Sequence, residues 1–139
     1  MRRMANRLII FDTSVFIDHL RTAKHTARIS AVSGLIRNSA VVLSELLRGA
    51  TKGDELAFIK NLAKNHPIMT PTEKNWIESG EILGKVYRDM GFGPEKLRDL
   101  HFDVLIALSA RHFGATVIAS NHRDFELIKK YREFALEVW

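Results

Sequence analysis

The sequence predicts an α/β fold built on a mostly parallel sheet. Short apolar runs, such as Leu8–Phe11 and Thr116–Ala119, are bounded by polar residues and are too short to be helices standing alone. Longer segments with apolar residues on one face separate these runs. Strands that alternate with helices are typical of a parallel sheet. The length of 139 residues, 46% of them hydrophobic, fits one domain, residues 1–139, with a substantial core.

The first half of the chain supplies two of the predicted strands and four of the predicted helices. The strands are Leu8–Phe11 and Ala40–Leu43, and the helices are Thr13–Arg21, Thr26–Arg37, a segment from Ser44 to near Gly49, and Asp54–Lys64. In the last of these, apolar residues recur at helical spacing, and His66-Pro67 ends it.

The second half continues the alternation. Short strands are expected at Ile68–Met69, Thr116–Ala119 and Phe134–Val138, and helices at Thr72–Met90, Asp99–Phe113 and His122–Lys130. Glycines at 91 and 114 end the two long helices. The segment "GFGPEK", residues 91–96, is expected to be a loop.

Composition excludes several classes of protein. The absence of cysteine excludes disulfides and thiolate metal sites. No apolar run approaches the roughly 18 residues of a membrane span, and the run after the basic "MRRMANR" is too short for a signal peptide, so the cytoplasm is the expected location. The net charge of +5, from 21 Lys and Arg against 16 Asp and Glu, is compatible with a polyanionic partner such as RNA.

Polar side chains follow three of the predicted strands. Asp12 comes directly after the first strand, Glu45 just after the second and Asn121 just after the third. In parallel sheets, functional residues gather outside the carboxyl ends of the strands. We therefore expect these side chains to lie near one another, at one edge of the sheet.

Asp103 is the acid that is hardest to explain by structure alone. It lies on a helix that is apolar nearly all round, in the segment "DLHFDVLIALSARHFG", so a compensating cation, hydrogen-bond donor or metal ion is expected. If Asp12 and Glu45 lie beside it, the three carboxylates repel one another unless a divalent ion neutralises them. Oxygen ligands without cysteine indicate Mg²⁺ or Mn²⁺ rather than zinc.

The other acids have structural alternatives. Asp12 is suited to cap the helix that follows it. Glu45 has the place of an acid in a first helical turn, with Ser44 as the cap. Asn121 and Asp124 have the spacing of a capping box.

The remaining polar residues are expected to have structural or solvent-facing roles. Asp99 is a candidate helix cap, and Asp18, Asp54, Asp89 and Glu95 are expected to face solvent. The six histidines lack metal-ligand spacing, although His101 and His122 lie near the proposed site and are candidate substrate contacts. The chain has neither a phosphate-binding P-loop nor a G-x-S-x-G nucleophile elbow.

Three segments together resemble a known family. "LIIFDTSVFIDHLR", "VVLSELLRGA" and "FDVLIALSARHFGATVIASNHRDFELI" are similar, in that order, to the signature segments of PIN-domain ribonucleases, above all to VapC-type toxins of toxin–antitoxin pairs. The resemblance implies a three-layer α/β/α sandwich with a four- or five-stranded sheet. It also implies an endoribonuclease that depends on Mg²⁺ or Mn²⁺, is a homodimer, and is inhibited by a small antitoxin protein.

The resemblance also assigns roles to residues. Asp12, Glu45 and Asp103 match the first three family acids, which are the expected catalytic and metal-binding residues, and Ser14 matches a small hydroxyl residue that supports the metal site. The fourth acid of many members stands 18 residues after the third, where this chain has Asn121, with Asp124 three residues later. Asn offers one oxygen but no charge, so the second metal site is expected to be weak, with Asn121 and Asp124 as weaker ligands.

Phosphate contacts and alternative functions complete the predictions. Arg21, Arg48 and Arg123 stand beside the signature segments and are candidate phosphate contacts, with solvated surface charge as the alternative.

One other function is a catalytically weak PIN-like module that acts through an antitoxin partner or in RNA processing. Another is a phosphotransfer domain with Asp12 as acceptor, which the missing D-x-D start disfavours.

Overall fold

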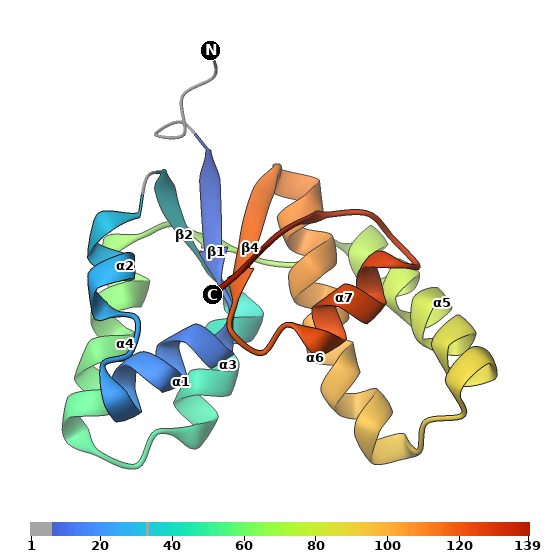
Figure 1. Cartoon of the computed structure of the whole chain (residues 1–139), viewed down its shortest axis with the longest axis horizontal. Helices are drawn as coiled ribbons and strands as arrows, with labels where there is room; N and C mark the ends of the chain where they lie inside the picture. The colour runs from blue at the N-terminus through green and yellow to red at the C-terminus, as the bar shows by residue number, and fades with distance from the viewer. Residues whose placement is uncertain (1–6, 33) are drawn as a thin grey trace.

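The computed structural model describes residues 7–32 and 34–139, so most of the basic "MRRMANR" segment lies outside the described residues. Five parallel strands form one sheet in the order β3-β2-β1-β4-β5 (Figure 1). The strands are β1 Leu8–Phe11, β2 Leu35–Ser39, β3 Ile68–Met69, β4 Ala115–Ala119 and β5 Ala135–Val138. The predicted α/β class and parallel sheet are confirmed.

Helices cover both faces of the sheet. They are α1 Thr13–Thr22, α2 Thr26–Ala31, α3 Ala40–Gly49, α4 Gly53–Asn65, α5 Glu73–Met90, α6 Pro94–Phe113 and α7 Arg123–Lys129. In Figure 1, α1, α2 and α4 lie to one side of the sheet and α5, α6 and α7 to the other. This is the three-layer arrangement that the family resemblance implies. Among the described residues, no helix is both long and apolar enough to cross a membrane.

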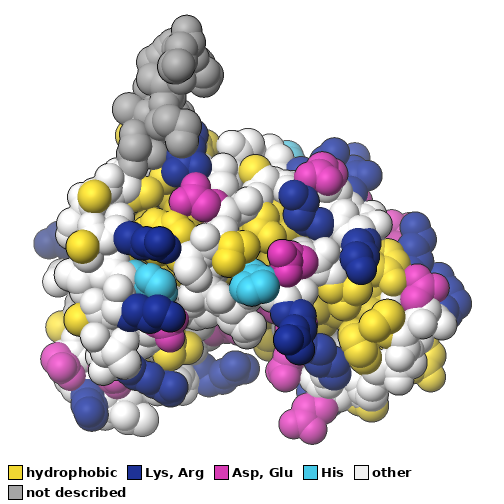
Figure 2. All heavy atoms as spheres, viewed as in Figure 1, with side chains coloured by type: hydrophobic (Ala, Val, Ile, Leu, Met, Phe, Trp, Pro, Cys, Tyr) yellow, Lys and Arg dark blue, Asp and Glu magenta, His cyan; other side chains and the backbone are white. Residues whose placement is uncertain are grey.

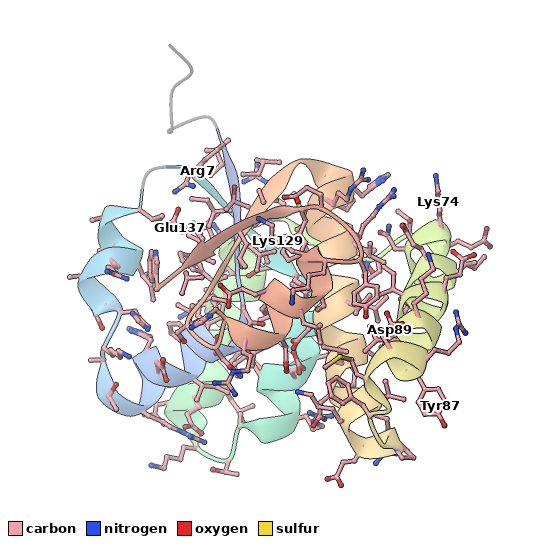
Figure 3. The ribbon with its side chains drawn as sticks, turned by 45° about the vertical axis from the view of Figure 1, so that its right-hand side comes forward. Arg7, Lys74, Tyr87, Asp89, Lys129 and Glu137 are labelled. Atoms are coloured by element: carbon pink, nitrogen blue, oxygen red, sulfur yellow. The ribbon has the colours of Figure 1, made fainter. Side chains whose placement is uncertain are left out.

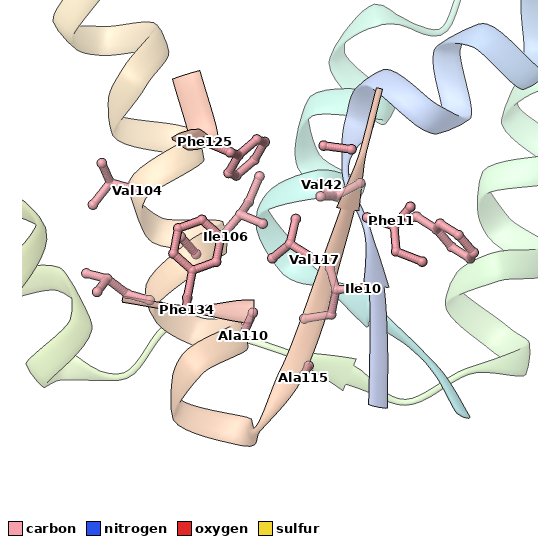
Figure 4. Packing of buried hydrophobic residues seen from close by; sticks show 14 of the residues in the cluster. Ile10, Phe11, Val42, Val104, Ile106, Ala110, Ala115, Val117, Phe125 and Phe134 are labelled. Atoms are coloured by element: carbon pink, nitrogen blue, oxygen red, sulfur yellow. The ribbon is translucent and has the colours of Figure 1, made fainter. Parts of the chain in front are cut away.

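The core lies on both sides of the central strand β1. Ile9, Ile10 and Phe11 are at most 2% exposed, because a strand covered on both faces must be apolar throughout. Figure 4 shows Phe125 and Phe134 filling the space on the α6 side of the sheet, with Phe11 pointing to the opposite side. Each such side chain contributes about 1.5–3 kcal/mol to folding, so the ends of β1 and β4 are held on a firm base.

The second strand was predicted in the wrong place. Residues 40–43 form the first turn of α3, and β2 comprises Leu35–Ser39. The Ser39 side chain accepts a hydrogen bond from the backbone N–H of Val42 at 3.3 Å and so caps α3. Val42 and Leu46, one helical turn apart, are both buried. The β-branched run therefore belongs to a helix face, and Ser44 is not the start of the helix.

The predicted helix Thr26–Arg37 begins correctly but ends at Ala31, and residue 33 lies outside the described residues. Val32, which follows the helix, is extended, and Gly34 stands directly before β2. Its φ is +146°, and a Cβ there would lie 2.6 Å from Cδ1 of Ile9. Only glycine tolerates this backbone and this close approach to β1.

Helix α6 begins earlier than predicted. Pro94 belongs to the segment expected to be a loop, yet it is the first residue of α6. A proline is tolerated there because the N–H group at the first helical position has no partner within the helix. Asp99 is consequently an exposed residue in the second turn and not the cap. Asp103 lies at the middle of α6. The other predicted elements agree with the structure to within one or two residues at each end.

The outer strand β5 is tied to the centre of the sheet by charge. Nη1 of Arg7 donates to Oε1 of Glu137 at 3.0 Å. Figure 3 shows the Arg7 and Glu137 side chains on neighbouring parts of the ribbon. The pair therefore links the start of β1 to β5, where Glu137 lies in register with Ile118 of β4.

Candidate active site

Asp12 stands where β1 ends and α1 begins, and its side chain is fixed there. Its backbone N–H continues the sheet by donating to the carbonyl of Ile118 at 2.8 Å. Its carboxylate accepts from the backbone N–H of Ser14 at 3.1 Å and from the Ser14 hydroxyl at 2.7 Å. Asp12 is therefore the N-cap of α1, as one alternative held, and is 5% exposed. Burial raises the pKa of Asp12, and the hydrogen bonds from Ser14 and Thr13 oppose that rise.

Ser14 joins the ends of two strands. Its Oγ donates to Asp12 and accepts from the backbone N–H groups of Ser120 and Asn121, both at 3.2 Å. One hydroxyl thus connects the turn after β1 with the turn after β4. The structure places Ser14 beside the first acid, as a supporting residue should be.

Glu45 is positioned by α1, not by a helix cap. It lies in the second turn of α3, which Ser39 caps, so the predicted first-turn position with Ser44 as cap is wrong. Oγ1 of Thr13 donates to Oε1 of Glu45 at 2.8 Å. Burial raises the pKa of Glu45, the Thr13 bond lowers it, and the charge of Asp12 raises it further. Thr13 and Ser14 therefore each hold one of two neighbouring carboxylates.

Asp103 is the most perturbed acid. Burial is the main cause that raises its pKa from 3.8 to about 9, followed by the charges of Asp12, Glu45 and Asp124, while Lys96 lowers it. No hydrogen bond from the described residues contributes to this shift. The residue is half-buried in the middle of α6, not in a first helical turn. The folded chain therefore opposes ionisation of Asp103, and a cation beside this acid would favour it.

Asn121 and Asp124 do not form the predicted capping box. His122 is the N-cap of α7 and makes no side-chain capping bond, and Asn121 is exposed. Both carboxylate oxygens of Asp124 accept from Nζ of Lys96, at 2.8 and 2.9 Å. The structure therefore pairs Asp124 with a lysine, although its charge still reaches Asp103.

The three arginines lie around these acids. Arg21 lines a hollow together with Glu45 and the ends of α3 and α4. The guanidinium carbon of Arg48 lies 5.6 Å from the ring centroid of Phe102, and its charge lowers the pKa of Glu45. Arg123 is exposed and lines a hollow with Lys96 and Asp124.

The surface around the strand ends is hollowed and basic. In Figure 2 the molecule is indented at the bottom of the view, below the sheet and between the two groups of helices, and Lys and Arg side chains gather on both sides. Basic borders of this kind are suited to a polyanion.

Several other expectations have clear outcomes. Asp54, Asp89 and Glu95 are exposed as predicted, but Asp18 is half-buried and accepts a hydrogen bond from the Ser120 hydroxyl at 2.9 Å. His25 is buried against Trp139, a structural role. His101 contacts Ser79 at 3.0 Å, and burial lowers its pKa. His122 is exposed and lies 2.7 Å from Glu126.

The side chains of Asp12, Glu45 and Asp103 have the ligand chemistry that a divalent cation requires. Asp12, Glu45 and Asp103 form no ion pair with any described residue, and each has a raised pKa. Hard oxygen ligands with uncompensated charge are what Mg²⁺ and Mn²⁺ prefer. As the side chains stand, however, no three His, Asp or Glu residues within 7–32 and 34–139 are gathered closely enough to hold a metal ion.

Comparison with known proteins gives the family. The family model described as "PIN domain" matches residues 9–131. The chain belongs to the PIN-domain family. No curated protein matches this PIN domain by sequence.

Solved structures share its fold over nearly the full length. VapBC from Salmonella typhimurium bound to DNA is similar at 23% identity and a TM-score of 0.70, over 96% of this chain and 98% of that one. VapBC2 from Rickettsia felis, bound to a promoter DNA fragment, is similar at 20% identity and a TM-score of 0.68, over 95% and 98%. VapBC-1 from nontypeable Haemophilus influenzae is similar at 18% identity and a TM-score of 0.69, over 95% and 98%.

Sequence reasoning missed two residues of this PIN domain's site. Thr13 is not among the predicted site residues, yet its hydroxyl donates a hydrogen bond to Glu45, which lies 32 positions further along the chain. Lys96 was assigned to a loop, yet it pairs with Asp124 across 28 positions. For Thr13 the available signal was its place directly after a strand-end acid. Lys96 carried no local signal.

Proposed function

We propose that this PIN domain is a metal-dependent endoribonuclease and the toxin of a toxin–antitoxin pair. The observation that carries the proposal is the set of three buried or half-buried carboxylates, Asp12, Glu45 and Asp103, which no described cation pairs with and whose pKa values are all raised. Family membership supports a nuclease, and the fold shared with VapBC complexes supports an antitoxin partner.

The three carboxylates would hold Mg²⁺ or Mn²⁺. When bound, the ion supplies positive charge for the phosphoryl oxygens and lowers the pKa of a coordinated water. Ser14 keeps Asp12 in place and Thr13 keeps Glu45 in place, so two of the ligands are oriented before metal and RNA arrive.

The basic borders would hold the RNA backbone. Arg21, Arg48 and Arg123 lie beside the acids on three different helices or turns, so they could contact phosphates on either side of the bond that is cut. One water is consumed, one P–O bond of the backbone breaks, and the proton of the water passes to the leaving oxygen. No protein nucleophile is required.

The proposal extends to the setting of the protein. We propose one domain over residues 1–139, a homodimer in the cytoplasm, RNA as substrate and a small antitoxin as inhibitor. A second candidate function, a catalytically weak binding module, is favoured by one observation: as the side chains stand, the described acids do not enclose a metal site.

Cleavage of total cellular RNA by the purified, partner-free chain tests the proposal. We expect discrete products with Mg²⁺ or Mn²⁺, none with EDTA and none with Asp103→Asn. Asp99→Asn is the matched control, since Asp99 is an exposed acid one turn away on the same helix. Absence of cleavage by a chain that still binds an antitoxin would favour the binding module. Equal cleavage by Asp103→Asn would show that the assigned site is wrong.

A further inference from the structure

Lys96 is an unusual residue at its position in the fold. It is the third residue of α6. A cation there lies at the positive end of the helix dipole, which disfavours it. A helix-stabilising role therefore does not explain this lysine, so the explanation must lie in its contacts.

Those contacts lead to the candidate active site. The Lys96 ammonium donates to both carboxylate oxygens of Asp124, at 2.8 and 2.9 Å, and lies 5.8 Å from the ring centroid of Phe92. The Asp124 side chain is only 20% exposed. The ion pair joins α6 to α7 and acts electrostatically on Asp103 through both of its charges.

An ordinary surface ion pair differs from this one. The pair of Lys129, the last residue of α7, with Glu133 has a single contact at 3.3 Å, and its carboxylate is 79% exposed. Pairs of that kind contribute little. The Lys96–Asp124 pair occupies both oxygens of a mostly buried acid whose charge acts on Asp103. A second metal ion at this site would need such an acid as a ligand.

We propose that Lys96 is a resident cation of the active site, which occupies Asp124 in place of a second metal ion, so that the chain binds a single divalent ion. This rests on the proposed metal-dependent function and deepens it. Both oxygens of Asp124 are engaged, and Asn121 brings no charge. The fixed ammonium then supplies the positive charge that a second ion would otherwise bring.

Counting bound Mn²⁺ on the full, metal-free chain without RNA tests this inference. Free Mn²⁺ is measured by electron paramagnetic resonance during a titration. We expect one Mn²⁺ per chain for the wild type, the same for Asp124→Asn, and loss of that ion in Asp103→Asn. We expect Lys96→Met to bind a second, weaker Mn²⁺, because the Asp124 carboxylate no longer has a lysine partner. The double variant Lys96→Met with Asp124→Asn should again bind one Mn²⁺ per chain.

Controls keep the result interpretable. Lys129→Met removes a lysine–carboxylate pair from α7 and should leave one ion bound; Figure 3 shows Lys129 on the ribbon of α7. Circular dichroism checks that each variant is folded, and the Asp124→Asn result stands even if Lys96→Met does not fold.

Three results would overturn the inference. Two ions in the wild type, one of them lost in Asp124→Asn, would show that Asp124 is a metal ligand despite Lys96, while the metal-dependent function would stand. A folded Lys96→Met chain with only one ion would show that Lys96 does not hold the place of a cation. No Mn²⁺ bound by the wild type would overturn the proposed function together with the inference.

Discussion

Removal of the Asp103 charge should stabilise the metal-free protein at neutral and alkaline pH. The pKa of Asp103 is 3.8 as a free side chain and about 9 in the folded chain. Between these values the folded state keeps a proton that the unfolded state releases. The contribution of Asp103 to stability is therefore fully present below about pH 4 and is lost progressively as pH rises toward 9. This sign is opposite to that of an acid in a salt bridge.

The magnitude follows from the proton count. One proton gives a slope of about 1.4 kcal/mol per pH unit, so the free energy of unfolding falls by about 3 kcal/mol between pH 5 and pH 7 through Asp103 alone. For a chain of this size, that corresponds to roughly 10 °C in melting temperature. Asp12 and Glu45 also have raised pKa values and add to the slope in the same direction.

Urea unfolding in EDTA, followed by circular dichroism at several pH values from 5 to 8, measures this effect. Asp103→Asn introduces a neutral side chain of the same shape. We expect its free energy of unfolding to depend less steeply on pH, by the slope that one proton contributes, and to exceed that of the wild type at pH 8. Asp99→Asn, an exposed acid on the same helix, should keep the wild-type slope. Added Mn²⁺ should stabilise the wild type at pH 8 but not Asp103→Asn. Parallel pH curves for the wild type and Asp103→Asn would refute the reasoning.

Three further substitutions test the supports of the site and of the fold. Thr13→Val removes the 2.8 Å bond to Glu45 and should lower RNA cleavage about 10-fold or more with little change in melting temperature; an unchanged rate would mean that Glu45 needs no orientation. Ser14→Ala removes the hydroxyl bond to Asp12 and leaves the backbone bond, and it should weaken Mn²⁺ binding about 10-fold, measured by calorimetry. Equal affinity would show that the hydroxyl does not orient Asp12. Asn38→Ala removes the side-chain donor to the carbonyls of Leu62 and His66, of which Leu62 keeps a bond from the His66 N–H, and should cost about 1–3 kcal/mol in urea unfolding. A loss below about 0.5 kcal/mol would contradict that account.

Local patterns in the sequence were sufficient for the first part of the site. The apolar run of β1, Asp12 as a strand-end acid and the start of α1 all lie within a few residues of one another. A buried central strand must be apolar along its length, and the residue after it must begin a helix, so neighbouring residues carry the whole signal. The same holds for the glycine ends of α5 and α6.

The error at β2 has a tertiary cause. Arg37 and Asn38 made the true strand look polar, while the valines of α3 looked like a strand. Asn38 is 4% exposed because its side chain donates to the carbonyls of Leu62 and His66 at the end of α4. A polar residue can be buried only when such partners exist, and these partners stand more than twenty positions away in the chain.

The sequence by itself determined the α/β class and the central strand, and it predicts the three acids, because strand periodicity, capping and charge are visible in short segments. Only the tertiary structure decided what each acid contacts. Thr13 holds Glu45, and Lys96 holds Asp124, through side chains that the sheet order and the packing of α6 against α7 bring together. Contacts of this kind have no local pattern, because their geometry exists only once the separate elements have packed.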